Sequence, residues 1–287
     1  MLQFTRKVRK SLTCTRYAMV IILLFLVKTG FSQVTLTATS GTATGSFTTL
    51  KGAFDAINTG THKGVIVIMI NNNTTETASA SLTASALVST SAPYYTSVTI
   101  YPTTTGLSIT GAFATPLINL NGADNVTIDG RVNTTGTTKS LTITNTSAVA
   151  TAGTSTIRCI GDASNNTVQY CTLKGSSTDA AAGIVLFSTT TATTGNDNKT
   201  IDNNDITCAA DAGRPLNAVF ALGTTGKNNE SNTISNNNIY NFLNKAIASQ
   251  GINISSYNSG FTISGNSFYE TASFAASGAV NYKVKSL

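Results

Sequence analysis

An internal repeat with a period of about 30 residues is the feature that most limits what this chain can fold into. A template of Thr, an aliphatic residue, two polar residues, Asn, one polar residue and an apolar residue recurs, with small deviations, in residues 167–173, 200–206, 233–239 and 262–268. Its aliphatic anchors Val168, Ile201, Ile234 and Ile263 are 33, 33 and 29 residues apart. Each period therefore corresponds to one unit of structure.

A second set of short β-forming runs advances with the first. Its members are residues 157–160, 184–187, 219–222, 252–255 and 280–283. Runs this short, broken by Asn, Gly, Ser and Thr, predict strands rather than long helices. A period near 30 made of short strands predicts a parallel β-solenoid, with successive coils about 4.8 Å apart. The anchors should then stack in one column inside the solenoid. A second apolar column should consist of Leu173, Ile206, Ile239 and Phe268.

Asparagine recurs three residues after the anchor, at Asn204, Asn237 and Asn266. The chain must turn there between two strands, and Asn tolerates the left-handed conformation that such turns use. Its amide can donate to one neighbouring coil and accept from the other, so we expect a structural ladder of these three side chains. Cys171 takes the same position one coil earlier and should end the ladder.

These motifs resemble the right-handed parallel β-helix of the pectate-lyase type, and residues 125–130 (Asn-Val-Thr-Ile-Asp-Gly) are similar to a strand opening common in that superfamily. The stretch from about Phe47 to Tyr269 resembles repeat-rich proteins exported to the surface of gliding-type bacteria. The resemblance implies the handedness of the coil. It leaves the activity open, because this scaffold carries lyases, hydrolases and adhesins alike.

Residues 1–32 have the pattern of a secretory signal peptide. They hold six Lys and Arg and no acid, an apolar run at 18–27, and small residues at Gly30 and Ser32, which predicts cleavage before Gln33 and a secreted or cell-surface location. The run is too short to span a bilayer. Without this segment 12 Lys and Arg face 12 Asp and Glu, so the mature chain is near neutral and lacks the clustered cations of a nucleic-acid-binding protein.

The remaining chain divides into residues 33–62, an N-terminal strand and capping helix, and residues 63–287, the β-helix. Phe47, Leu50, Phe54 and Ile57 follow a helical spacing, with Ser46 as the expected N-cap. This helix should hide the apolar end of the stack. Residues 65–70 should follow as a buried strand. A new coil begins near residue 278 without a capping segment after it, so we expect a chain truncated at its C-terminus.

Cysteine and histidine give no metal site. Cys159, Cys171 and Cys208 form an odd set whose spacing fits neither a disulfide framework nor zinc, and we expect buried, inert thiols. The single histidine, His62, should be a surface residue in a turn. No cofactor is predicted.

Carboxylates do not converge in the predicted columns. Asp202 aligns with Gln169, Ser235 and Ser264, and Asp205 aligns with Thr172, Asn238 and Ser267, so neither has an acidic neighbour of the kind that a glycosidase pair needs. The Gly-His-Gly element of polygalacturonases is missing. A calcium site formed by Asp202 and Asp205 with Asp197 or Asn203 is the alternative to a solvated polar turn.

One outward column is a candidate for ligand binding. Arg158, Val185, Phe220 and Asn253 should alternate with inward Cys159, Leu186, Ala221 and Ile254. Phe220 would then lie exposed beside Val185 and stack against a sugar ring or a partner. Coverage of this column by the turn at residues 188–199 is the alternative.

Three functions fit these observations. The first is a noncatalytic exported module for adhesion or for binding a polysaccharide or cell-surface glycan, as a monomer or as part of a longer chain. The second is a polysaccharide lyase or glycoside hydrolase, or a fragment of one, using Asp202 and Asp205. The third is a structural spacer without a ligand.

Overall fold

The computed structural model describes residues 32–86 and 90–271. The predicted signal segment up to Phe31 and the expected final coil near residues 280–283 lie outside the described residues, as do residues 87–89. The described residues belong to one compact unit. In its described part, no helix is long and apolar enough to cross a membrane.

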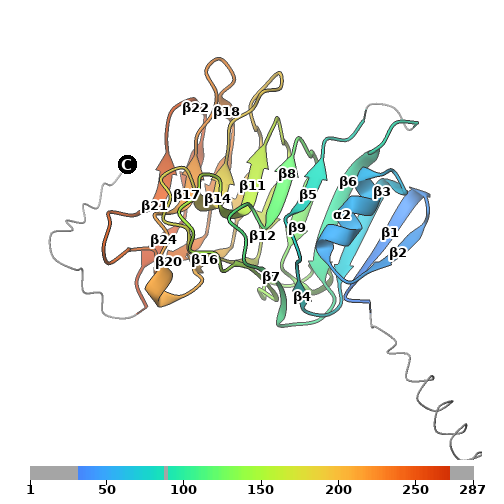
Figure 1. The fold of residues 1–287 in the computed structure, drawn as a ribbon, viewed down its shortest axis with the longest axis horizontal. Helices are drawn as coiled ribbons and strands as arrows, with labels where there is room; N and C mark the ends of the chain where they lie inside the picture. The colour runs from blue at the N-terminus through green and yellow to red at the C-terminus, as the bar shows by residue number, and fades with distance from the viewer. Residues whose placement is uncertain (1–31, 87–89, 272–287) are drawn as a thin grey trace, which may run out of the picture. The chain divides into compact units, whose positions relative to one another are not determined.

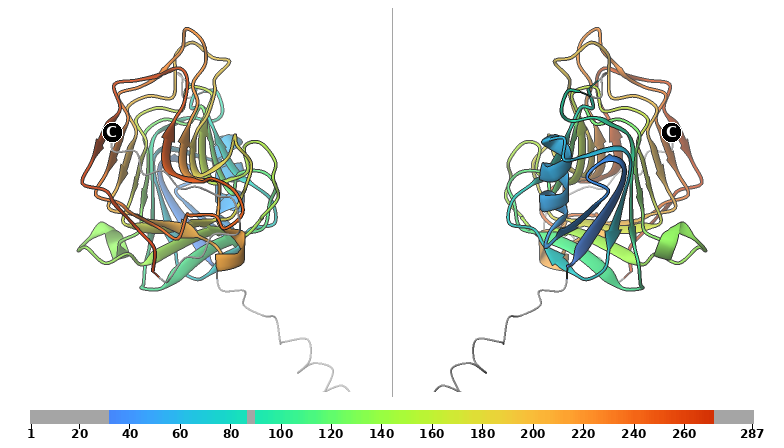
Figure 2. Two further views of the ribbon diagram at one scale, coloured as in Figure 1. Left: turned by 90° about the vertical axis from the view of Figure 1, so that its left-hand side faces the viewer. Right: turned by 90° about the vertical axis from the view of Figure 1, so that its right-hand side faces the viewer.

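The described chain is a right-handed parallel β-solenoid whose strands pair side by side along the long axis (Figure 1). Each coil contributes one strand to each of three sheets, and six complete coils lie between β3 and β21 in the described residues. The views along the axis show the coils superimposed (Figure 2). The fold class predicted from the repeat is therefore confirmed.

We call the three large sheets A, B and C, in the order in which each coil visits them. Sheet A contains, in spatial order, β2 (Thr44–Phe47), β1 (Val34–Gly41), β3 (His62–Ile70), β6 (Tyr95–Pro102), β9 (Val126–Asp129), β12 (Thr167–Gln169), β15 (Thr200–Asp202), β19 (Thr233–Ser235) and β23 (Thr262–Ser264). Sheet B contains β4 (Thr74–Thr75), β7 (Leu107–Gly111), β10 (Leu141–Asn145), β13 (Cys171–Gly175), β16 (Asp205–Cys208), β20 (Asn238–Tyr240) and β24 (Ser267–Tyr269).

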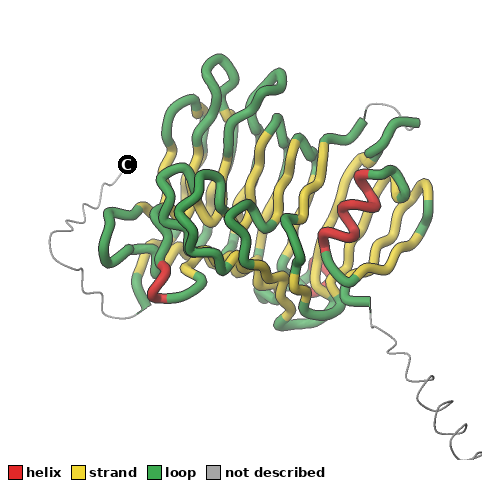
Figure 3. Tube along the Cα trace, in the orientation of Figure 1, coloured by secondary structure: helices red, strands yellow, loops and turns green. Residues whose placement is uncertain are grey.

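Sheet C contains β5 (Ala80–Thr83), β8 (Ile118–Asn121), β11 (Ser155–Ile160), β14 (Gly183–Phe187), β17 (Asn217–Ala221) and β21 (Gln250–Ile254). A small ladder pairs β18 (Asn229–Glu230) with β22 (Asn258–Ser259). Short 3-10 turns, η1 (Val132–Thr134) and η2 (Asp211–Gly213), lie in two of the connections. Loops make up much of each coil (Figure 3).

The predicted aliphatic columns are in register. Val168 pairs with Ile201, Ile201 with Ile234, and Ile234 with Ile263, and the first three are at most 2% exposed. The column continues backward through Ile128, Ile100 and Ile68. Each fully buried side chain contributes roughly 1.5 to 3 kcal/mol. In sheet B, the second predicted column of Leu173, Ile206, Ile239 and Phe268 is also in register. Phe268 is 50% exposed because it lies on the last described strand.

The N-terminal end is covered by α2 (Leu50–Asn58), which lies beside the β1–β2 hairpin (Figure 2). Leu50, Ala53, Phe54 and Ile57 are buried, as the spacing predicts. The expected start at Ser46 is wrong, because Ser46 lies in β2. The N-cap is Thr49, whose Oγ1 accepts from the Gly52 amide at 3.1 Å.

A distant carboxylate completes this helix start. Glu76 accepts from the Leu50 and Lys51 amides, at 2.9 Å each. A negative group there complements the helix dipole. Burial raises the pKa of Glu76, while these two hydrogen bonds oppose the rise.

His62 is a correction to the sequence analysis. It lies in β3 at 2% exposure, where its Nδ1 is 2.7 Å from the Thr42 carbonyl oxygen and its ring meets Phe47 edge to face. The strand begins three residues earlier than expected, so His62 falls on its inward side. Within the same strand Val65 is 47% exposed, so the expected continuous buried run is an alternating one.

The amide side chains at the corner between sheets A and B form a continuous hydrogen-bonded ladder. Asn204 Nδ2 donates to Asn237 Oδ1 at 3.1 Å, and Asn237 Nδ2 donates to Asn266 Oδ1 at 2.9 Å. Asn204 Oδ1 accepts from the backbone amide of Cys171, where the side-chain ladder ends. The left-handed residue is the one before the ladder, as at Asn203 and Asn236, so that expectation was one position off.

A second amide ladder, absent from the sequence analysis, runs along the corner between sheets C and A. Asn196 Nδ2 donates to Asn229 Oδ1 at 3.0 Å, and Asn229 Nδ2 donates to Asn258 Oδ1 at 3.1 Å. Its members are 33 and 29 residues apart, the same spacing as the anchors. Aligning every Asn by the repeat period would have found it.

Replacing Asn237 by Ala removes a donor to Asn266 and to the Ile201 carbonyl, and the acceptor of the Asn204 amide. Leaving buried polar groups without partners should lower the free energy of unfolding by about 3 kcal/mol. Urea unfolding followed by circular dichroism measures this.

The matched control is Asn238→Ala, because that half-exposed amide donates to Asp205 on the outer face. We expect a loss below about 1 kcal/mol from one partly solvated bond. Equal losses in the two variants would contradict the structural role of the ladder.

Candidate functional site

The outward column of sheet C carries the residues that the sequence analysis selected for ligand binding. Arg158 pairs with Asn119 on one side and Leu186 on the other, Leu186 pairs with Phe220, and Phe220 with Asn253. Arg158, Phe220 and Asn253 are thus on one face, as predicted.

Val185 is not part of that column. It pairs with Ile157 and Val219, is 1% exposed and belongs to the core, so the expected inward and outward roles of Val185 and Leu186 are reversed. The four apolar residues of 184–187 do not alternate with polar ones, so the pattern could not fix which of them face inward.

Phe220 is not an exposed platform. It is 5% exposed and Leu186 is 2% exposed, because loops cover this face. The covering residues include Ala152 and Gly153 from the β10–β11 connection and Ala181 from the β13–β14 connection. The turn that was expected to cover the column contributes Ser188 and Thr189.

A groove of about 280 Å³ remains between these loops and sheet C. Apolar side chains form much of its lining, together with one cation, Arg158, and two hydroxyl-bearing residues. The lining residues are Ala152, Gly153, Arg158, Ile160, Ala181, Leu186, Ser188, Thr189, Phe220 and Leu222. Asn253 is not among them, and its Nδ2 instead donates to Asn217 Oδ1 at 3.1 Å.

Arg158 is half-buried in this groove. Its Nε donates to Asn119 Oδ1 at 3.0 Å, which holds the guanidinium plane against the sheet. Burial lowers the pKa of Arg158, and no carboxylate is among the causes of that shift.

The connections between sheets B and C, two of which contribute residues to the groove, are stacked on one another. The Leu216 amide donates to the Ser177 carbonyl at 3.0 Å, and the Gln250 amide donates to the Leu216 carbonyl at 2.8 Å. Ser177 Oγ in turn donates to the Val149 carbonyl at 3.1 Å. The coil stacking therefore extends from the strands into these connections.

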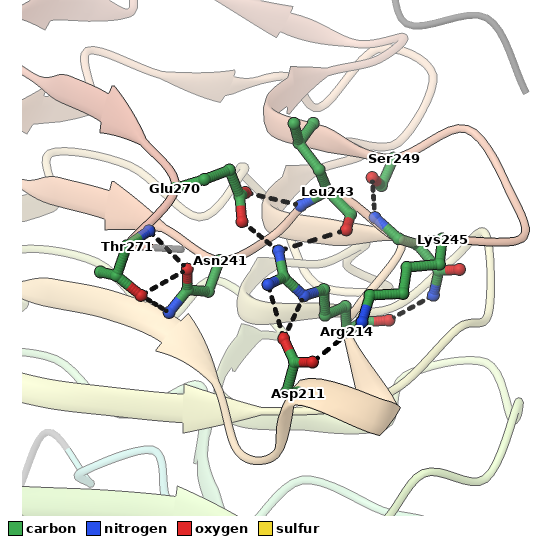
Figure 4. A network of polar contacts seen from close by, with 9 residues as sticks. Asp211, Arg214, Asn241, Leu243, Lys245, Ser249, Glu270 and Thr271 are labelled. Carbon is green, nitrogen blue, oxygen red and sulfur yellow. Dashed lines mark hydrogen bonds and ion pairs between the residues drawn. The ribbon is translucent and has the colours of Figure 1, made fainter. Parts of the chain in front are cut away.

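A buried arginine fixes the far end of this stack (Figure 4). The Arg214 side chain is 4% exposed and pairs with both Asp211 and Glu270. The Asn244 side chain donates to the Arg214 carbonyl at 2.6 Å, and Lys245 pairs with Asp211 at 3.0 Å. Residues from three consecutive coils thus meet at one guanidinium.

Asp202 and Asp205 align with the predicted neighbours but act in separate contacts. Asp202 accepts from Ser235 Oγ at 2.6 Å and from Asn236 Nδ2 at 2.9 Å. Partial burial opposes its ionisation, yet these bonds and one from Asn203 leave its pKa lowered. Asp205 pairs with Lys139 and accepts from Asn238 Nδ2 at 2.9 Å.

Asp197 lies at another corner, where it accepts from the Glu230 amide at 2.7 Å. Among the described residues, no group of three or more His, Cys, Asp or Glu is placed to hold a metal ion. Asp197, Asp202 and Asp205 are therefore not brought together as a group of three. Cys159 and Cys171 are buried and Cys208 is half-buried, all three as free thiols.

The sequence analysis missed a buried lysine. Lys199 falls between Asn166 and Asn232 in the column two residues before the anchors, and its amide donates to Asn232 Oδ1 at 2.9 Å. Its side chain enters the core at 1% exposure, with Nζ 5.6 Å from the Phe187 ring centroid and without a hydrogen-bond partner. Burial lowers the pKa of Lys199 to about 8.

No family model, no curated protein and no solved structure matches this chain.

Lys199 makes stability depend on pH in a definite direction. The folded pKa of about 8 lies below the value of about 10.4 of an unfolded lysine, so the folded state resists protonation. Lys199 should therefore add up to about 3 kcal/mol to the free energy of unfolding as pH rises from about 8 to about 10. Burial raises the pKa values of Cys159, Cys171 and Cys208, whose contributions have the opposite sign, so the effect of Lys199 is measured as the difference between a variant and the wild type.

Lys199→Asn places an amide in the column of Asn166 and Asn232 and should remove this contribution to the pH dependence. At pH 7 the variant should be more stable than the wild type, as measured by urea unfolding at pH 7 and pH 9.5. Lys174→Asn on the outer face of sheet B serves as the control and should keep the wild-type pH dependence. An unchanged pH dependence in Lys199→Asn would show that the ammonium is solvated.

Proposed function

We propose that this chain is a noncatalytic, exported β-helix module that binds glycan through the groove over sheet C. The observation that carries this is the groove itself, in which Leu186, Phe220 and Leu222 border the hydroxyls of Ser188 and Thr189. Apolar walls with a few polar groups suit a sugar, whose ring has apolar faces and a hydroxylated rim.

The sequence supports export and adhesion. The basic and apolar pattern of residues 1–32 supports secretion to the cell surface. The repeat supports a relationship to surface proteins of gliding-type bacteria and to the pectate-lyase type of β-helix. In that setting a glycan-binding face serves attachment.

The aspartates give the enzyme alternative no support. The Asp202 carboxylate accepts hydrogen bonds from Ser235 and Asn236. The Asp205 carboxylate pairs with Lys139 and accepts a hydrogen bond from Asn238. A general acid or nucleophile needs an accessible carboxyl group facing the substrate. We therefore assign binding rather than cleavage.

Filling the groove should weaken glycan binding. Ala181 lines it and Ala180 does not, so Ala181→Leu and Ala180→Leu form a matched pair at neighbouring positions. On a glycan array followed by calorimetry, Ala181→Leu should weaken binding about tenfold or more, the equivalent of about 1.4 kcal/mol. Phe220→Ala, checked for folding by thermal melting, should weaken binding as well.

Equal binding by wild type, Ala181→Leu and Phe220→Ala would remove this groove from consideration. Release of reducing or unsaturated ends from polysaccharides, lost in Asp202→Asn, would instead establish the enzyme.

A further inference from the structure

The groove contains a cation, Arg158, that no carboxylate of the described residues neutralises. The described residues contain three arginines, and two of them are paired with carboxylates: Arg131 with Asp129, and Arg214 with Asp211 and Glu270. Arg158 has no carboxylate partner in the described part of the chain. No Asp or Glu lines the groove in which it lies.

The guanidinium of Arg158 is held by one hydrogen bond and keeps N–H donors that no protein acceptor uses within the described residues. Nε donates to Asn119 Oδ1. Nη1 lies close to Gly153, since a Cβ atom built on that glycine would be 3.0 Å from Nη1. Within the described residues, neither Nη1 nor Nη2 has a protein acceptor. Arginine presents its donors in a fixed fork that matches a carboxylate or sulfate.

The surroundings strengthen this preference. Leu186 at 2% exposure and Phe220 at 5% follow Arg158 along the column, so one side of the cation is apolar. A partly desolvated cation gains from an incoming anion more than a fully solvated one does, because less water screens the interaction. A neutral ligand would leave the charge uncompensated.

We propose that the groove selects a sugar unit carrying an anionic group, with Arg158 as the anion subsite. This inference rests on the proposed glycan-binding function. The anionic group meets the Nη donors of Arg158, and the sugar that carries it occupies the groove bordered by Leu186, Phe220 and Leu222. The column runs along the solenoid axis, so a longer chain would extend over neighbouring coils.

The test uses the intact protein and three probes of equal length: a neutral oligosaccharide, its uronate counterpart and its sulfated counterpart. Affinities are measured by calorimetry at two sodium chloride concentrations for wild type, Arg158→Gln, Arg158→Lys and Lys174→Gln. Lys174 lies on the outer face of sheet B, away from the groove, and is the charge-matched control.

We expect the wild type to bind one anionic probe at least about tenfold more tightly than the neutral probe, because a hydrogen bond to a charged group contributes enough free energy for that difference. The difference should shrink at higher salt. Arg158→Gln should bind all three probes equally, Arg158→Lys should keep part of the preference, and Lys174→Gln should match the wild type. Comparison of the uronate and sulfated probes identifies which anion the fork accepts.

Two results would overturn the inference alone: equal wild-type affinity for neutral and anionic probes, or a preference that survives in Arg158→Gln. Absence of binding to all three probes would overturn the proposed function as well. Binding of an acidic peptide in place of every glycan probe would also refute the inference, and would identify a protein partner. Thermal melting of each variant shows whether a loss comes from unfolding.

Discussion

The structure depends on the satisfaction of polar groups at the corners, where each coil leaves one sheet and enters the next. At the corner of sheets A and B, a left-handed residue such as Asn203 precedes the ladder residue Asn204, whose amide bonds to the coils on both sides. Without these amides the turn would bury unpaired backbone groups. Because the need recurs once per coil, an Asn recurs at the same corner in three successive coils.

This requirement leaves the outer face free to vary. Inward columns must stay aliphatic, whereas Arg158, Leu186 and Phe220 follow one another outside without affecting the stack. The loops between sheets B and C differ in length and close over that face, with Arg214 fixing one end of their stack. A uniform scaffold thus carries a local groove with its own chemistry.

Sequence alone predicted the fold and the inward columns, because anchors such as Ile201 and Ile234 alternate with polar residues and recur at one period. It misplaced Val185, since an unbroken apolar run carries no alternation, and it could not show that loops bury Phe220. Lys199 gave a weak signal, a cation aligned with Asn166 and Asn232. Burial of its ammonium follows from tertiary packing, which the repeat does not encode.

The central claim, that coils lie on one another in register, is tested most directly by spin-label distances along one outward column. Thr127, Thr167, Thr200, Thr233 and Thr262 occupy that column on five successive coils. With Thr262 labelled in every pair, dipolar broadening for the short distances and electron–electron double resonance for the longest should give about 5 Å to Thr233, about 10 Å to Thr200, about 14 Å to Thr167 and about 19 Å to Thr127. Distances that do not lengthen by one strand spacing per coil would contradict the account.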